Sequence, residues 1–181
     1  MDSYAEQIVK KSDDGSDNAK RMLCLIGGIA AGILIIVISM FIHLTLIGSV
    51  LGVLAFYGGL YLGTNYDVEY EYLIVNGEFD IDKIMAKKRR KKMLTVKVGD
   101  FEDFGIYTKD MTEPEDVTLI WAVGTAPGEE YDTYYADFSH SVYGKCRLLI
   151  SPSVKVLREI KLYLKGQLKT RIGDLPAEEE F

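Results

Sequence analysis

Cysteine and histidine are scarce in this sequence, and their scarcity excludes two kinds of chemistry. The 181 residues include two cysteines and two histidines. Cys24 begins an apolar run, whereas Cys146 lies far along the chain in a predicted strand, so we expect no disulfide between them. Only His43 and His140 could join the two cysteines as zinc ligands, and we expect no zinc chemistry from so small an inventory. We therefore predict no metal site and no cofactor.

Charge is missing from one long stretch. From Met22 to Tyr66 there are 45 consecutive residues without Asp, Glu, Lys or Arg, and all 48 charged residues lie outside it. Such segregation is typical of a membrane protein. The apolar part, residues 22–63, would form a helix about 63 Å long, twice the hydrocarbon core of about 30 Å. We therefore predict a two-span transmembrane hairpin over residues 22–64, with a turn near 41–45 that no Pro or Gly marks.

The flanking charges predict the orientation of this hairpin. Lys20 and Arg21 precede the first span, and the loop between the spans carries no Lys or Arg. Basic residues stay on the cytoplasmic side, so residues 1–21 are predicted to be a cytoplasmic N-terminal segment, and two spans return the chain to the cytoplasm. A cleaved signal peptide is disfavoured, because the apolar stretch is too long and about 20 polar residues precede it. The prediction is a multi-pass protein of the plasma membrane with both termini cytoplasmic.

Six glycines in the apolar stretch form three pairs spaced four residues apart. Glycine allows helix backbones to approach closely in lipid. We expect these glycines to seat the two spans of one hairpin against each other, and a dimer between two chains is the alternative. The glycines are Gly28, Gly32, Gly48, Gly52, Gly59 and Gly63.

After Tyr66 the apolar pattern changes to a period of two. Val68 to Ile74 alternate with glutamates, and Asn76-Gly77 is the strongest short hairpin signal. Phe79 and Ile81 alternate with Asp80 and Asp82 on the far side of this turn. Further strand-like runs follow at residues 93–98, 104–108, 117–123, 133–138 and 143–150.

The last element differs, because Ser151-Pro152 is a helix start and leucines then recur at helical spacing. We predict one helix over 152–168, covering a small sheet domain of residues 67–169. The fold class is thus a membrane helical hairpin followed by a mainly-β barrel or sandwich capped by a C-terminal helix. Residues 170–181 are predicted to be a disordered acidic tail.

A search for catalytic residues finds isolated features only. Asp80 and Asp82 share one face of a strand, as carboxylates on a solvated sheet face commonly do. Asp100, Glu102 and Asp103 lack the glycine and the ligand spacing of a calcium loop. Ser139-His140-Ser141 has no nucleophile-elbow glycines and no evident orienting acid. We therefore predict that the protein is not an enzyme.

One basic run stands out in a chain whose net charge is −6. Near the inner leaflet, each basic residue of such a run contributes about 1 kcal/mol of attraction to anionic lipid. The competing interpretation is a solvated hairpin end. Nucleic acid is disfavoured, because the run contains no aromatic residue and the rest of the protein is acidic. The run consists of Lys87, Lys88, Arg89, Arg90, Lys91 and Lys92.

Several passages carry a family resemblance. They are the opening YAEQIVK, the post-membrane YEYLIVNGEFDIDKI with its KKRRKK run, and the closing RLLISPSVKVLREIKLYL. The order of elements resembles the pleckstrin-homology-like domains of bacterial membrane proteins. More narrowly, the passages resemble a family of two-span proteins from Gram-positive bacteria whose domain has no known function. The resemblance implies a fold and a membrane location, but no activity and no functional residues.

Three functions remain open at this point. The leading hypothesis is a non-enzymatic, membrane-anchored interaction module whose domain binds a protein partner or itself at the cytoplasmic face. The second is a binder of membrane lipids that recognises an anionic surface through residues 87–92. The third is an accessory subunit of a membrane enzyme or transporter.

Overall fold

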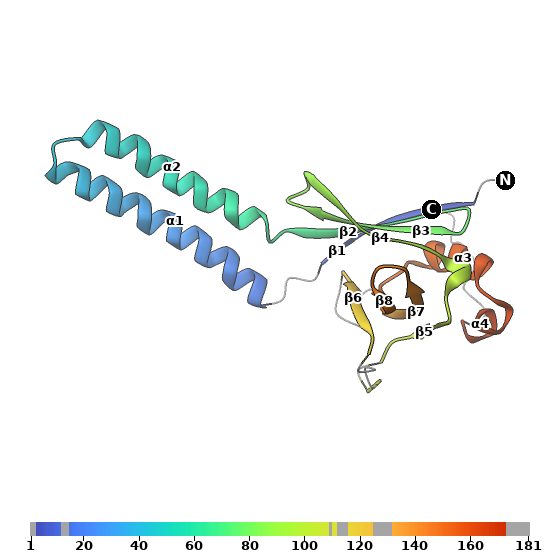
Figure 1. Ribbon diagram of the computed structural model, residues 1–181. Helices are drawn as coiled ribbons and strands as arrows, with labels where there is room; N and C mark the ends of the chain where they lie inside the picture. Colours follow the sequence, from blue (N-terminus) through green and yellow to red (C-terminus); the bar gives the residue numbers. More distant parts are fainter. Residues whose placement is uncertain (1–2, 12–14, 109, 112–115, 125–131, 173–181) are drawn as a thin grey trace. The chain divides into compact units, whose positions relative to one another are not determined.

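A computed structural model describes most of the chain (Figure 1). The described residues are 3–11, 15–108, 110–111, 116–124 and 132–172. Their contacts form two units, a helical one and a β-rich one, and each is compact by itself. The helical unit comprises Asp13–Val68 and Met85–Arg89, and the β-rich unit comprises Met1–Ser12, Glu69–Ile84 and Arg90–Phe181.

The helical unit is a hairpin of two apolar helices, α1 (Gly15–Phe41) and α2 (Thr45–Thr64). The turn between them falls within the predicted range of 41–45. His43 adopts the left-handed conformation there, with φ 57°, and histidine is among the residues enriched in that region. The Leu44 N–H donates to the Ser39 carbonyl at 2.9 Å. The turn therefore needs neither glycine nor proline.

From Met22 to Leu62, the exposed residues of this hairpin are mainly apolar. Both helices are long and apolar enough to cross a membrane, as judged by length and composition. In α2 the buried residues are all glycines, whereas large side chains such as Leu46 and Phe41 are 81% exposed. The hairpin therefore turns its small residues inward and its bulky ones outward, the reverse of a helix pair in a water-soluble core.

The first strand, β1 (Tyr4–Lys10), precedes the hairpin, and its partner β2 (Val68–Val75) follows it. They pair antiparallel in a register that runs from Tyr4↔Val75 to Lys10↔Glu69. The domain boundary drawn at residue 67 is therefore wrong, because residues 4–10 belong to the β-rich unit. Local sequence does not reveal this, since the partner of β1 lies beyond the whole hairpin.

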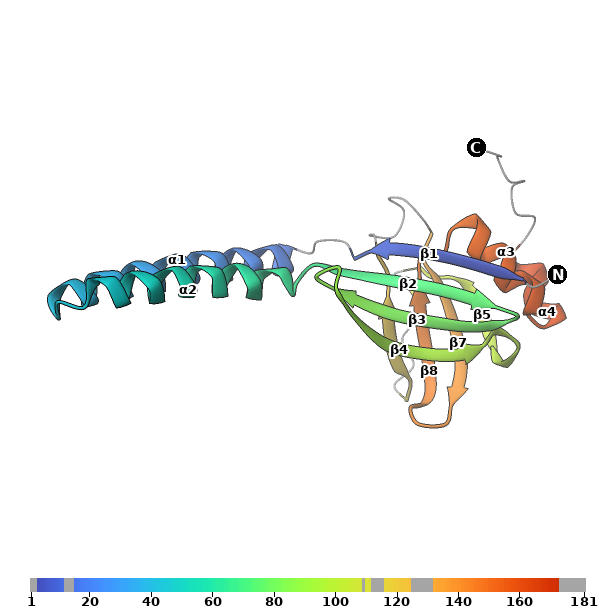
Figure 2. The same cartoon turned by 90° about the horizontal axis from the view of Figure 1, so that it is seen from above.

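The first sheet has the order β1-β2-β3-β4 (Figure 2), with β3 (Glu78–Met85) and β4 (Arg89–Lys97) completing it. Asn76 and Gly77 join β2 to β3 with φ 50° and 80°. Positive φ at both central positions is the geometry of a type I′ turn, so the predicted hairpin is confirmed. A short 3-10 turn, η1 (Val98–Asp100), follows β4.

The second sheet contains four strands in the order β5-β7-β8-β6. They are β5 (Asp103–Ile106), β6 (Thr118–Ala122), β7 (Tyr134–His140) and β8 (Gly144–Ile150), and β6 runs parallel to β8. Both sheets contribute to one apolar core. Tyr72 of β2 is fully buried there, and its hydroxyl donates to the Ala122 carbonyl of β6 and accepts from the Ser151 N–H. Burial raises the pKa of this phenol.

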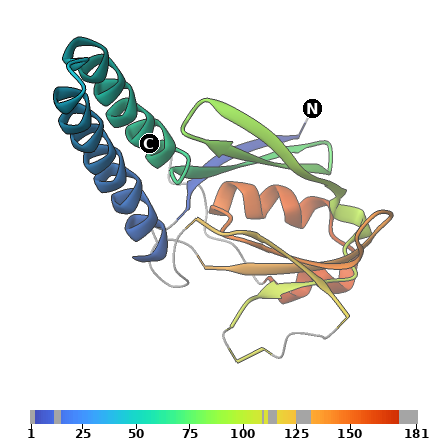
Figure 3. The same cartoon turned by 60° about the vertical axis from the view of Figure 1, so that its left-hand side comes forward.

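Two short helices replace the single helix predicted over 152–168. They are α3 (Val154–Tyr163) and α4 (Gly166–Arg171), separated by Leu164 and Lys165 in extended conformation, with ψ 150° and 148°. The capping residue is Ser153, whose hydroxyl accepts from the Val156 N–H at 3.4 Å. In Figure 3, α3 lies between the two sheet layers, beside β1.

The structure describes only the first three residues of the predicted tail, 170–172. Thr170 and Arg171, which the sequence assigned to that tail, belong to α4. Residues 173–181 lie outside the described part of the chain.

Strand β1 supplies a test of this architecture. Val9 is 3% exposed, and the Gln7 side chain accepts from the Ser153 N–H at 2.7 Å and donates to the Ser151 carbonyl at 3.2 Å. A fragment that begins at residue 67 loses all of these contacts. We expect it to lose at least about 2 kcal/mol of unfolding free energy, the contribution of one buried valine.

The matched comparison keeps β1 and removes only the hairpin. Replacing residues 12–67 by Asn-Gly connects Lys11 to Val68 through a two-residue turn, as the antiparallel register allows. Urea denaturation followed by circular dichroism should show this version to be the more stable. Equal stability of the two proteins would show that β1 contributes nothing to the fold.

Candidate functional site

Carboxylates gather on the outer face of the first sheet. Because side chains alternate along a strand, the residues between the core positions of β1, β2 and β3 all point to this face. It carries Glu6 beside Leu73, and Glu71 beside Ile8. Asp80 and Asp82 occupy the corresponding positions of β3. Without cations nearby, the negative charges of these carboxylates would repel one another.

Part of the basic run neutralises this row. Lys87 and Lys88 lie in the turn between β3 and β4, and Arg89 to Lys92 open β4. Arg90 Nη1 lies 2.8 Å from Glu71 Oε2, so its side chain reaches over β3 to β2. Lys92 Nζ lies 3.0 Å from Asp80 Oδ1. Two of the six cations therefore belong to the surface of the sheet itself.

The two paired carboxyls titrate in opposite directions. Glu71 is 7% exposed, and this burial raises its pKa, with Glu6 and Asp82 adding to the rise and Arg90 opposing it. Burial alone would also raise the pKa of Asp80, but hydrogen bonds from Thr95 and Lys92 outweigh it and lower that pKa. The hydrogen bonds to Asp80 and the acidic neighbours of Glu71 account for the difference.

A groove of about 360 Å³ lies over this charged face. Its apolar part includes Tyr4 and Val75, which are 50% and 39% exposed, together with Leu73. Its polar part includes the two ion pairs Arg90–Glu71 and Lys92–Asp80. We call this groove with its lining the sheet groove. Exposed aromatic and aliphatic groups beside arginine are typical of protein-binding surfaces.

The predicted packing glycines lie at the contact between α1 and α2. A Cβ atom built on Gly28 would lie 2.9 Å from Gly59 Cα, and one on Gly32 would lie 2.8 Å from the Gly52 carbonyl oxygen. Gly48 abuts Ser39, and Gly63 lies beside Arg21 with more room. Contacts this close exclude side chains.

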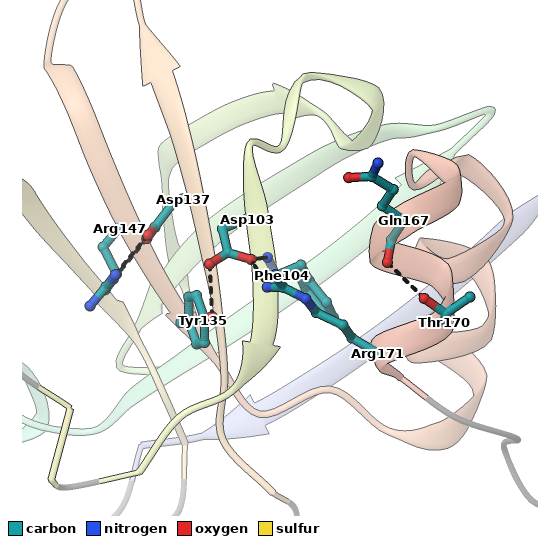
Figure 4. A network of polar contacts seen from close by, with 8 residues as sticks. All are labelled: Asp103, Phe104, Tyr135, Asp137, Arg147, Gln167, Thr170 and Arg171. Atoms are coloured by element: carbon teal, nitrogen blue, oxygen red, sulfur yellow. Dashed lines mark hydrogen bonds and ion pairs between the residues drawn. The ribbon is translucent and has the colours of Figure 1, made fainter.

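A second polar network occupies the other sheet and was not predicted (Figure 4). Arg147 forms a two-point ion pair with Asp137, with Nε–Oδ1 2.7 Å and Nη2–Oδ2 2.6 Å. Its guanidinium lies 5.0 Å from the centre of the Tyr135 ring. The Tyr135 hydroxyl donates to Asp103 at 3.0 Å, and Asp103 also binds Arg171 of α4. The network therefore ties α4 to the sheet.

Four of the remaining candidates from the sequence, Glu102, Asp103, Ser139 and His140, make contacts within the second sheet and its turns. Asp103 belongs to this network, and Glu102 accepts from the Ser139 hydroxyl at 2.7 Å. His140 stacks on Tyr143, and its Nδ1 accepts from the Val142 N–H at 3.2 Å. No nucleophile is thus aligned with a base at Ser139-His140-Ser141 among the described residues. Cys24 and Cys146 are both free thiols.

The glycine contacts predict that substitutions at Gly58 and Gly59 differ in their effect on the stability of the hairpin. Gly59→Leu places a side chain against the Cys24 carbonyl, where even a Cβ would lie 2.6 Å away, whereas Gly58 has open space around it. We expect Gly59→Leu to destabilise the hairpin by about 2 kcal/mol or more through overpacking. Gly58→Leu should leave it unchanged.

Thermal melts of both variants in detergent, with the molar mass measured alongside, test this contrast. A lower melting temperature confined to Gly59→Leu supports packing within one chain. A change in molar mass with unchanged melting would instead assign these glycines to a dimer.

The ion pair between Arg90 and Glu71 predicts that removing Arg90 changes the pKa of Glu71. Arg90→Gln removes the cation that opposes the raised pKa of Glu71, so that pKa should rise further. A carboxyl whose native pKa is raised binds its proton more tightly in the folded state. Stability therefore falls as pH rises from the ordinary value of 4.5 through the native pKa. The variant should lose more stability than the parent over that interval.

Carbon-13 NMR titration of the Glu71 carboxyl measures this shift directly. Lys91→Gln is the matched control, because it removes a neighbouring exposed charge that is not paired with Glu71. An identical Glu71 titration in the parent and in Arg90→Gln would show that the ion pair does not form in solution.

Comparison with known proteins agrees with this architecture. No curated protein and no solved structure matches the chain. One family model, described as Bacterial PH-like domain (DUF6106), matches residues 1–170. The match includes β1, both apolar helices, both sheets and nearly all of α4. The chain therefore belongs to the bacterial PH-like domain family DUF6106, a family of unknown function.

Proposed function

We propose that this protein is a membrane-anchored, non-enzymatic interaction module. The helical hairpin holds it in the plasma membrane, and the β-rich domain binds a protein partner or a second copy at the cytoplasmic face. The observation that carries the proposal is the sheet groove, in which exposed Tyr4 and Val75 lie beside ion-paired Arg90 and Lys92.

The pairing of β1 with β2 supports the anchored topology. Lys10 and Glu69 are neighbours in the sheet, and only four and three residues connect the strands to α1 and α2. The start of α1 and the end of α2 connect to β1 and β2. If these two helix ends lay on opposite sides of a bilayer, the paired ends of the strands would be drawn into the hydrocarbon core. Unsatisfied backbone groups there cost several kcal/mol each. Lys20 and Arg21 favour the cytoplasm for that common side.

Several features of the sheet groove favour a protein as the partner. Its long side chains are held by ion pairs, so little rotamer entropy remains to be lost on binding. Tyrosine and arginine are the residues that most often dominate binding energy at interfaces. The carboxylates beside them suit a partner that brings its own cations. An accessory role beside a membrane enzyme or transporter is one form that such a partnership takes.

Binding of anionic lipid through residues 87–92 is the second candidate. Arg90 and Lys92 are partly neutralised by Glu71 and Asp80, which lowers the attraction below about 1 kcal/mol for each of them. The exposed Lys88 and Lys91 favour this candidate. Its attraction to acidic vesicles is consequently weaker than six adjacent cations suggest.

The topology is tested with reporters placed before residue 15 and after Phe181. Both should report the cytoplasm, since the paired strands require a common side. Reporters found on opposite sides of the membrane would contradict the proposed anchor.

The binding surface is tested in cells with a photo-crosslinking amino acid at exposed positions. Ile8 and Val75 lie on the outer face of the first sheet, and Val142 lies in the β7–β8 turn with 76% exposure. We expect discrete protein adducts, or a dimer of this chain, from the first two positions only. The adducts should be lost when Arg90 and Tyr4 are replaced by Glu and Ala.

The same domain without its hairpin distinguishes a protein partner from lipid. If lipid is the partner, the domain should sediment with acidic vesicles at low salt, and Lys88→Gln with Lys91→Gln should abolish this. If a protein is the partner, these two substitutions should leave the crosslinks at Ile8 and Val75 intact. Identical crosslinking at Val142 would contradict a specific surface.

A further inference from the structure

A separate groove opens on the helical hairpin, near the ends of α1 and α2 that connect to the strands. It has a volume of about 540 Å³, within the range of small-molecule sites in proteins. It is lined by one stripe from each helix, and we call it the hairpin groove. The lining residues are Asn18, Arg21, Met22 and Leu25 of α1, with Tyr57, Gly59, Leu60, Tyr61, Gly63 and Thr64 of α2.

Helical spacing explains how the hairpin groove forms. Asn18, Met22 and Leu25 are four and three residues apart and so share one face of α1, and Tyr57, Leu60 and Thr64 share one face of α2. Gly59 and Gly63 leave the space between these faces unfilled. The helices already touch at this level, because a Cβ on Gly59 would lie 2.6 Å from the Cys24 carbonyl. The groove is therefore a consequence of how the two helices pack.

The lining changes character along the groove. The residues that line its strand-side end include Arg21, Asn18 and Thr64, and those that line the rest are mainly aliphatic and aromatic. Arg21 is the last charged residue before the 45-residue stretch without charge. A charged group followed by an apolar slot matches one molecule of the bilayer, an anionic phospholipid, with its phosphate at Arg21 and an acyl chain along Leu25 and Leu60.

We propose that the hairpin groove binds one anionic phospholipid, and this proposal rests on the proposed membrane insertion of the hairpin. The phosphate accepts hydrogen bonds from Arg21, which no carboxylate of the described residues neutralises, whereas Lys20 lies 3.8 Å from Asp17. Arginine binds phosphate through two parallel hydrogen bonds, which gives geometric specificity. Every phospholipid carries this phosphate, but an anionic one has no headgroup cation to offset the phosphate charge or repel Arg21, so the net charge of the headgroup selects the lipid.

A second copy of the chain fits the hairpin groove less well. Close helix approach in lipid needs small residues at the contact, and Gly59 already serves the contact within the hairpin. The outward residues Met22, Tyr57 and Tyr61 are bulky and more than 60% exposed. A symmetric dimer would also bring two Arg21 side chains to the same depth.

The test measures lipid in the groove with a fluorescent reporter. The chain has one tryptophan, Trp121, so the double variant Trp121→Phe/Tyr61→Trp reports only from the groove. The full-length variant is placed in neutral bilayers with rising fractions of phospholipid brominated on its acyl chain, because bromine quenches tryptophan at short range. The two probes, brominated phosphatidylglycerol and brominated phosphatidylcholine, differ only in their headgroups.

We expect phosphatidylglycerol to reach half-maximal quenching at about a tenfold lower fraction than phosphatidylcholine, because the choline cation offsets the phosphate charge that Arg21 contacts. Adding Arg21→Gln should abolish this preference. Adding Lys20→Gln, which removes the same charge one residue away, should retain it. Native mass spectrometry should find one retained anionic lipid per chain.

Other results overturn the proposal. Equal quenching by both lipids shows that the groove does not select a headgroup, and equal loss in both charge variants shows diffuse attraction only. A dimer without lipid preference assigns the groove to a second copy. Flotation of the same samples separates the two proposals: a chain that fails to float with vesicles contradicts membrane insertion, whereas one that floats without lipid preference contradicts only the groove.

Discussion

Seven residue pairs, from Tyr4↔Val75 to Lys10↔Glu69, hold β1 against β2. Because β1 precedes the apolar hairpin and β2 follows it, both ends of the hairpin are connected to neighbouring strands of one sheet. Most other features follow from this pairing. It completes the first sheet, places Val9 and Ala5 in the core, and positions Gln7 to bond the start of α3. It also makes the hairpin an insertion within the domain, so folding of the domain and placement of the helices are coupled.

The two faces of the first sheet follow from one alternating pattern. The inward residues of β2 and β3 build an apolar core, and the outward ones create a row of carboxylates that needs cations nearby. The basic run supplies them through Lys92, which joins β4 to β3, and Arg90, which joins β4 to β2. The sheet therefore divides a run that reads as a single strip of positive charge, because it pairs Arg90 and Lys92 with its own carboxylates. That division is what favours a protein partner over a lipid surface in the proposed function.

The hairpin uses its residues in a similarly divided way. Glycines bring α1 and α2 into contact, and the bulky residues face away from that contact. Where Gly59 and Gly63 adjoin larger neighbours, the same arrangement leaves the hairpin groove, which Arg21 also lines. The close helix contact and the hairpin groove thus arise from the same absence of side chains at glycine. The hairpin groove and the sheet groove lie in different units of the chain, so the lipid and the partner that we propose for them would bind at separate places.

The sequence by itself determined the apolar hairpin, its turn near His43, the Asn76-Gly77 turn and the strands after residue 67. Each of these depends on local spacing, because hydrophobic period, turn residues and span length act between near neighbours. Tertiary structure alone decided the place of β1, the break between α3 and α4, and the partners of Arg90 and Lys92. These depend on residues far apart in the chain, such as Glu71 two strands away from Arg90, and no local pattern encodes which distant strand will lie alongside.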